Sequence, residues 1–149
     1  MYVMAKLFEE SASNIIECAE QAGIPNIVEP DALHVTVFKS FNDMSDFVPA
    51  GTFPYMLPVE VRMWDVFRTN HGTRCLVLVL DSLPLHIRHS DLREKYGESH
   101  ISDKYHVYLP HVTVSYDIED FDPSTIWMKF PKVIYLKSEQ SEAAIEDSV

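Results

Sequence analysis

One short motif occurs twice in this sequence, and its residue types are suited to acid–base chemistry. The tetrapeptide His-Val-Thr-Val begins at His34 and again, 77 residues later, at His111. Because the reference pKa of histidine is about 6.5, one imidazole can accept a proton near neutral pH while a second, protonated imidazole donates one. A threonine hydroxyl beside each imidazole can donate a hydrogen bond to a phosphate oxygen. The two copies therefore indicate cleavage of a phosphodiester without a metal, with catalytic roles for His34, Thr36, His111 and Thr113.

Both copies of the motif lie in stretches with the composition of a β-strand. Residues branched at Cβ favour strands, and successive side chains of a strand point to opposite faces. The histidine and threonine of each copy therefore share one face, and the two valines share the other. We expect the valines to be buried and the polar residues of the two copies to face each other across a cleft.

The order of the expected elements is that of an α+β protein with two similar lobes. Each half contains a helix followed by one copy of the motif, and the segments on either side of residues 70–72 are expected to form a hairpin. We expect one domain, residues 1–149, in which two pseudo-symmetric lobes of mostly antiparallel sheet, with flanking helices, surround a central cleft. The expected strands are 2–8, 33–38, 59–67, 74–80, 109–116 and 133–137. The expected helices are 11–22, capped by Ser11 or Ser13, and 84–96. Residues 41–58 and 100–108 are expected to be irregular, and residues 141–149 are expected to form an acidic tail.

Charge and composition argue against several classes of partner. The net charge of −11 disfavours duplex DNA and long RNA, although an acidic protein can still bind a small nucleotide in a pocket of hydrogen-bond donors. No apolar run has membrane-spanning length, and the N-terminus lacks the pattern of a secretory signal. The two cysteines lack metal-site spacing and are expected to be reduced thiols. His86 and His89 have the i,i+3 spacing of one helix face, but no acidic or cysteine cluster completes a ligand set, so we expect neither a metal nor a cofactor.

Two His-x-Thr motifs on strands in separate halves of a small α+β protein resemble the 2H phosphoesterase superfamily, and the resemblance covers essentially the whole chain. In size, motif pair and aromatic-rich first half, the sequence resembles the anti-CBASS nucleases of tailed phages. The resemblance implies metal-independent cleavage of 3′–5′ bonds in cyclic oligonucleotide second messengers, such as 3′,3′-cGAMP and related cyclic di- and trinucleotides. Cleavage would block antiphage CBASS signalling in the cytoplasm of the infected bacterium. The ligand implied is therefore a small cyclic oligonucleotide, and we expect the enzyme to be a monomer.

The resemblance also implies a reaction path and residues that recognise the bases. A ribose 2′-hydroxyl would attack the adjacent phosphodiester, and the resulting 2′,3′-cyclic phosphate would then be hydrolysed, with the two histidines exchanging roles; which one acts first as the base is left open. Aromatic side chains can stack on bases, which favours Tyr2 and Trp64, and Glu139 could accept hydrogen bonds from an adenine amino group.

Two alternative functions remain open from the sequence. An RNA-end 2′,3′-cyclic phosphodiesterase or 2′–5′ RNA ligase-like enzyme would use the same catalytic groups with a different pocket rim. A non-catalytic sponge would bind cyclic nucleotides without cleaving them, and it would not need two proton-transfer groups.

Overall fold

The computed structural model describes residues 1–97, 107–126 and 129–143, which form two α-helices and six strands. The expected loop 100–108 lies mostly outside these residues, and so does the end of the expected acidic tail, after residue 143. The elements, in chain order, are β1 (Tyr2–Leu7), α1 (Glu9–Gln21), a 3-10 turn η1 (Pro30–Ala32), β2 (His34–Lys39), β3 (Gly51–Arg68), β4 (Arg74–Asp81), α2 (Leu83–Tyr96), β5 (His111–Ser115), a second 3-10 turn η2 (Pro123–Ile126) and β6 (Val133–Glu142).

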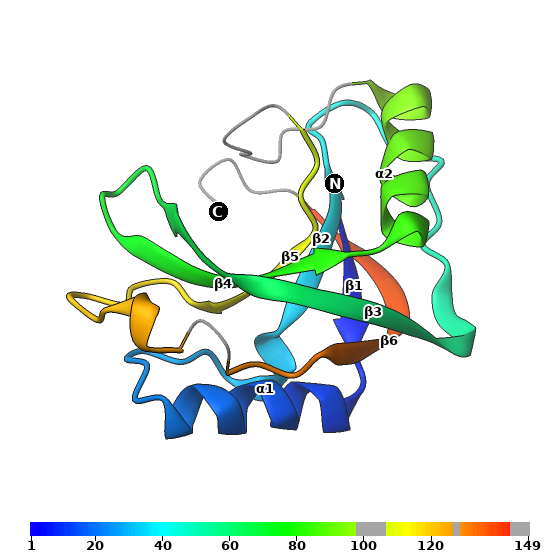
Figure 1. The fold of residues 1–149 in the computed structure, drawn as a ribbon. Helices are drawn as coiled ribbons and strands as arrows, with labels where there is room; N and C mark the ends of the chain where they lie inside the picture. Colours follow the sequence, from blue (N-terminus) through cyan, green and yellow to red (C-terminus); the bar gives the residue numbers. More distant parts are fainter. Residues whose placement is uncertain (98–106, 127–128, 144–149) are drawn as a thin grey trace.

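The six strands form one closed antiparallel sheet in the order β1-β2-β5-β4-β3-β6, and β6 pairs again with β1 (Figure 1). The prediction of an α+β protein with antiparallel strands is therefore confirmed. The expectation of two lobes on either side of a cleft is not, because β2 and β5, which carry the two copies of the motif, are neighbours in the same sheet.

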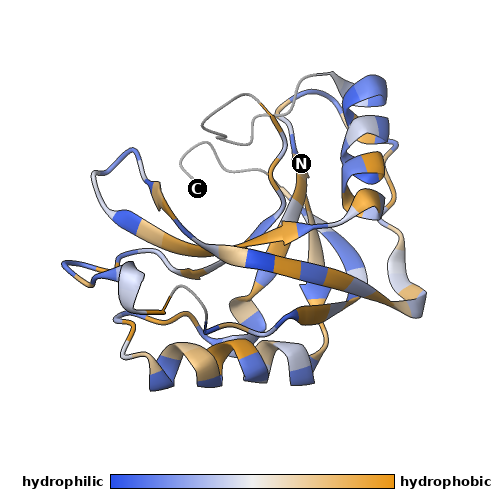
Figure 2. Cartoon of the chain, in the orientation of Figure 1, coloured by the Kyte–Doolittle hydropathy of each residue, from blue (hydrophilic) through white to orange (hydrophobic). Residues whose placement is uncertain are grey.

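A single large hydrophobic cluster fills the inner side of this sheet. Alternate residues of β1, beginning at Val3, point into it, and α1 closes one side with Ile15, Ile16 and Ala19. The opposite face of α1 is hydrophilic, as Figure 2 shows. The predicted cap of α1 is wrong: the helix begins at Glu9 without a side-chain cap, and the Ser11 hydroxyl instead accepts a hydrogen bond from the backbone of Tyr135 in β6.

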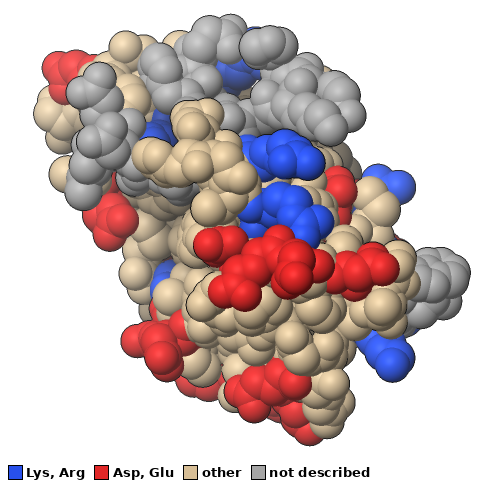
Figure 3. All heavy atoms as spheres, turned by 90° about the vertical axis from the view of Figure 1, so that its left-hand side faces the viewer, with Lys and Arg blue, Asp and Glu red and all other residues tan. Residues whose placement is uncertain are grey.

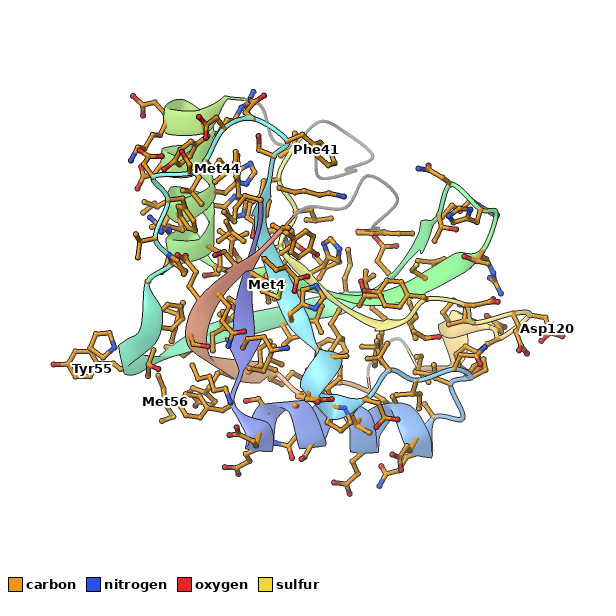
Figure 4. All side chains as sticks on the ribbon, turned by 180° about the vertical axis from the view of Figure 1, so that it is seen from behind. Met4, Phe41, Met44, Tyr55, Met56 and Asp120 are labelled. Atoms are coloured by element: carbon orange, nitrogen blue, oxygen red, sulfur yellow. The ribbon has the colours of Figure 1, made fainter. Side chains whose placement is uncertain are left out.

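Strand β3 is longer than predicted because it takes in half of the segment expected to be irregular. Its first residues, Gly51 and Thr52, pair with β6, the next four residues have no partner in β6, and pairing resumes at Leu57. Pro54 lies in this unpaired stretch, where its missing N–H costs no ladder hydrogen bond. Tyr55 and Met56 project from the same stretch, away from the sheet (Figure 4). Strand β6 is also longer than predicted and runs to Glu142, because its second half pairs with β1.

The hairpin of β3 and β4 and the second helix are confirmed. Gly72 adopts a φ of +84° in the hairpin turn, a conformation that favours glycine. Helix α2 begins after Ser82, whose hydroxyl accepts a hydrogen bond from the backbone N–H of Leu85, and it ends before Gly97. Among the described residues, no helix is both long and apolar enough to cross a bilayer.

Candidate active site

The two motifs meet where β2 pairs with β5. Val35 lies directly opposite Val112, and both valines are completely buried. Since these strands are antiparallel, the flanking positions place His34 beside Thr113 and Thr36 beside His111, on the face opposite the valines. All four of these side chains are partly exposed. The strands thus bring together the four residues for which the sequence predicted catalytic roles.

The two histidines occupy diagonal corners of this group of four. Diagonal neighbours across an antiparallel pair are separated by about 7–8 Å along the backbone, so their side chains can reach the same small group from two directions. The predicted arrangement differs in one respect, because the histidines approach from adjacent strands and not from opposite walls of a cleft. The separation nevertheless suits one phosphate between two imidazoles.

Both imidazoles are held in the same way by the backbone. His34 Nδ1 donates to the carbonyl of Ala32 at 2.8 Å, and His111 Nδ1 donates to the carbonyl of Leu109 at 2.7 Å. In each copy the acceptor lies two residues before the histidine. With the proton fixed on Nδ1, Nε2 is the atom of each neutral ring that can accept a proton.

Burial lowers the pKa of both histidines below their ordinary value. For His34, burial is the main cause, the hydrogen bond to Ala32 opposes it, Lys6 lowers the pKa further and Glu142 raises it. For His111, burial is again the main cause, the bond to Leu109 opposes it, and the charge of His34 lowers the pKa. The two imidazoles therefore disfavour being protonated together.

Tyr2 belongs to the same group, and its hydroxyl is the part that contacts the motif residues. The phenol oxygen is 3.0 Å from His34 Nε2 and 2.5 Å from Thr36 Oγ1, and the ring meets the imidazole edge-on with centroids 5.9 Å apart. Because His34 Nδ1 already donates to Ala32, the Tyr2 hydroxyl donates to Nε2 and accepts from Thr36. Tyr2 is only 8% exposed, so the polar end of this side chain is what it contributes to the site.

The second copy of the motif has aromatic neighbours too, which the sequence analysis did not single out. Burial is the main cause that raises the pKa of the Tyr116 phenol, three residues after Thr113, and the Thr113 hydroxyl lowers it. The Phe67 ring on β3 meets His111 edge-on, with centroids 4.9 Å apart. The position of Tyr116 beside the second motif was a usable signal; nothing in the sequence placed Phe67 there.

Trp64 and Glu139 do not lie with these residues. One row of paired positions crosses all six strands, and each member of it faces the inner side of the sheet, with the valines: Trp64, Leu78, Val112, Val35, Ala5 and Glu139. The Trp64 indole is 8% exposed and donates its N–H to the carbonyl of Lys129 at 2.8 Å. The register therefore places both residues on the face opposite His34 and His111, and their predicted contact with the substrate bases stays a prediction.

Glu139 has a different set of partners. Its carboxylate is 3% exposed and accepts two hydrogen bonds from Arg88 of α2, at 2.7 and 2.9 Å, and one from the backbone N–H of Ala50 at 3.0 Å. It ties α2 to β6 and to the segment before β3. The carboxylate of β6 that faces the histidines is instead Glu142, which pairs with Tyr2 in the sheet and acts electrostatically on His34.

The described residues contain no group of three or more His, Cys, Asp and Glu side chains placed to hold a metal ion. His86 and His89, whose i,i+3 spacing raised the question of a metal site, both contact the ring of Tyr108 with their own rings.

The closed antiparallel sheet that carries the two His-x-Thr motifs is a fold seen in a solved structure. The crystal structure of TT0787 of Thermus thermophilus has this fold: it is similar with a TM-score of 0.55 over 94% of this chain and 83% of that one, at 17% sequence identity. The family model of the anti-CBASS protein Acb1 matches residues 1–148.

Relatives from several phages carry the same family name. The anti-CBASS protein Acb1 of Salmonella phage S16 is 34% identical over 118 residues, which cover 79% of this chain and 72% of that protein. The Acb1 proteins of Yersinia phage phiR1-RT and Enterobacteria phage T4 are each 31% identical, over 91% and 79% of this chain and 78% and 72% of theirs. The chain belongs to the anti-CBASS Acb1 family.

Proposed function

We propose that this protein is a metal-independent phosphodiesterase of the 2H type that cleaves 3′–5′ bonds of cyclic oligonucleotide second messengers. The family supplies the biological context, since its name describes proteins that counteract CBASS, and the phage relatives place that action in the infected bacterial cell. The observation that carries the chemistry is the diagonal placement of His34 and His111, both with Nδ1 bonded to the backbone so that Nε2 is the nitrogen that can accept a proton.

The first step transfers the phosphoryl group within the substrate. Nε2 of the neutral imidazole takes the proton of a ribose 2′-hydroxyl, and O2′ attacks the adjacent phosphorus. The bond from phosphorus to O5′ breaks, and the protonated imidazole gives its proton to O5′. The products of this step are a 2′,3′-cyclic phosphate and a free 5′-hydroxyl.

The second step reverses the roles of the histidines. The imidazole that lost its proton now takes one from water, whose oxygen attacks phosphorus and opens the cyclic phosphate, while the other imidazole protonates the departing ribose oxygen. Both imidazoles return to their starting states. The lowered pKa of each ring makes its protonated form a stronger acid, which suits donation of the proton to the leaving oxygen.

The hydroxyls of the site position the phosphate. Thr113 lies beside His34, where its hydroxyl can donate to a non-bridging oxygen of a phosphate held between the rings, and Thr36 lies beside His111, where its hydroxyl would exchange the bond to Tyr2 for such an oxygen. The Tyr2 hydroxyl binds His34 Nε2, so a substrate oxygen that reaches this nitrogen exchanges with the phenol, which then donates to the phosphate. Tyr2 would thus bind the phosphate through its hydroxyl, whereas the sequence led us to expect that its ring stacks on a base.

Charge favours a small cyclic substrate over an RNA polymer. The net charge is −11, and on the face shown in Figure 3 a small cluster of lysines and arginines is bordered by carboxylates while the other basic side chains are scattered. A long RNA needs several phosphate contacts along a basic track, whereas a cyclic dinucleotide needs donors at one or two phosphates.

The test is turnover of 3′,3′-cGAMP by the purified protein in EDTA, followed by chromatography and by ³¹P NMR. We expect linear products and a transient 2′,3′-cyclic phosphate signal. RNA with a 2′,3′-cyclic end, assayed in parallel, should be turned over far more slowly. Faster turnover of the RNA would favour the RNA-end enzyme, and binding of cGAMP without cleavage would favour the sponge.

A further inference from the structure

The backbone pairing between the two histidine strands is very short. Within the described residues, β2 and β5 are paired at Val35 and Val112 alone. On the side of Thr113, the strand β5 continues by pairing with another segment, because the carbonyl of Val114 accepts from Val28 and Ser115 forms a bridge with Ile27. So short a ladder is a weak constraint on the sliding of β2 along β5.

On the other side of the valine pair, side chains bind the backbone of β2. The Tyr108 hydroxyl donates to the carbonyl of Thr36 at 2.8 Å, and His89 Nδ1 donates to the carbonyl of Val37 at 2.7 Å. These carbonyls belong to consecutive residues of the first motif, and Tyr108 lies three residues before His111 of the second. The hydrogen bonds therefore connect β2 to the segment that leads into β5 and to α2.

The two donors also hold each other. The rings of His89 and Tyr108 are stacked, with centroids 4.1 Å apart and planes 5° from parallel, and the side chains are 7% and 8% exposed. Phe38 packs against the His89 ring at 5.8 Å, and His86 meets the Tyr108 ring edge-on at 5.3 Å. Buried rings packed on several sides leave little freedom to either donor.

We propose that His89 and Tyr108 form a positioning clamp that sets the separation of His34 and His111 by fixing the β2 backbone relative to β5. This inference rests on the proposed function in that it assigns the clamp an effect on catalysis. A displacement of about 1 Å between reacting groups can cost about 100-fold in rate. Neither His89 nor Tyr108 needs to contact the substrate for this role.

An apolar pair of rings would fill the same space, but it would not bind these carbonyls. Burial without a partner is costly for a backbone carbonyl, so loss of either donor favours a shift of β2 that finds another one. The shift would move Thr36 directly and His34 through the strand.

The kinetic test compares two substitutions that each remove one phenol hydroxyl near α2. Tyr108→Phe keeps the stacked ring and removes the bond to Thr36, whereas the control Tyr96→Phe removes a bond to Asp46 far from the motifs. We expect Tyr108→Phe to lower kcat by roughly 10- to 100-fold with KM close to the wild-type value, and Tyr96→Phe to keep both. His89→Leu should also lower kcat, and His89→Asn, whose amide can replace Nδ1 as the donor, should recover part of it.

A second test needs no substrate and so remains decisive where the wild-type protein cleaves none. The pH midpoint of the His111 titration is measured by NMR in four proteins. These are the wild type, His34→Gln, Tyr108→Phe and the double variant that carries both substitutions. In the wild-type background, His34→Gln should raise the His111 midpoint, because the charge of His34 is removed. In Tyr108→Phe the rise should be smaller, since the rings lie farther apart. Wild-type kcat in Tyr108→Phe, or an unchanged rise in the titration, would overturn the clamp.

Discussion

His34 lies diagonally across the β2–β5 pair from His111, and each ring is bonded through Nδ1 to the carbonyl two residues before it. The two copies of the motif are therefore equivalent in tautomer and in backbone support. They differ in their surroundings, since His34 accepts from the Tyr2 hydroxyl and His111 packs on Phe67. The two histidines thus share a tautomer and a backbone hydrogen bond but have different neighbouring side chains. Four predictions test the site and the residues around it.

Replacement of either histidine should abolish turnover and spare much of the binding. In His34→Gln or His111→Gln, proton transfer at one oxygen is lost, and we expect kcat to fall by about 10²–10⁴-fold. His71→Gln in the β3–β4 turn is a matched control, since this side chain is exposed and distant from the paired motifs. Single-turnover kinetics with cGAMP measures the loss, and calorimetry measures the remaining affinity. A His111→Gln protein with undiminished kcat would contradict the proposed mechanism.

Removal of the Tyr2 hydroxyl should affect the reaction through phosphate binding and through His34. Tyr2→Phe loses the bonds to His34 and Thr36 but keeps the packed ring, so we expect kcat/KM to fall by on the order of 10²-fold, as on loss of one donor to a charged oxygen. Tyr55→Phe, at a ring that is 84% exposed on the tip of β3, should behave as wild type. If base stacking were the main contribution of Tyr2, the phenylalanine variant would keep its activity and only loss of the ring would matter.

The pH dependence of kcat/KM should be bell-shaped with its maximum on the acidic side of the ordinary histidine pKa. The active free enzyme has one neutral and one protonated imidazole, and the pKa of each is lowered by burial. The protonated form is therefore lost as pH rises through these lowered values, so activity should decline above about pH 6.5. Because Glu142 raises the pKa of His34, Glu142→Gln should shift the profile further to acid. A maximum well above pH 7 would contradict this ordering.

Glu139 should matter for stability and not for recognition of the substrate. Glu139→Gln weakens the two bonds from Arg88, and we expect the free energy of unfolding to fall by about 2 kcal/mol, as for hydrogen bonds to charged groups. Urea denaturation measures this loss, and KM for cGAMP at a temperature where the protein is folded should stay at the wild-type value. Glu142→Gln is the paired control, since it lies in the same strand on the face of the histidines. A large increase of KM in Glu139→Gln alone would restore the role expected from the sequence.

The local sequence was enough to predict the four motif residues and the face they share. Alternation along a strand follows from backbone geometry, so Val35 and Val112 had to point away from their neighbouring histidines and threonines. The hairpin and the end of α2 were also predictable, because Gly72 and Gly97 follow the patterns of a turn and a helix end.

Tertiary structure decided which strands are neighbours and where a bulge exchanges the inward-facing and outward-facing positions of a strand. In β3 a bulge between Val61 and Met63 lets both Val61 and Trp64 face the core, and in β6 a similar irregularity at Lys137 turns Glu139 inward. One extra residue exchanges the two faces of everything that follows it, and the need for it comes from the partner strand. Short-range pattern therefore predicted which residues could do the proposed chemistry, His34 and His111, whereas the long-range pairing of the closed sheet determined that their strands are neighbours and that Trp64 and Glu139 face the other side.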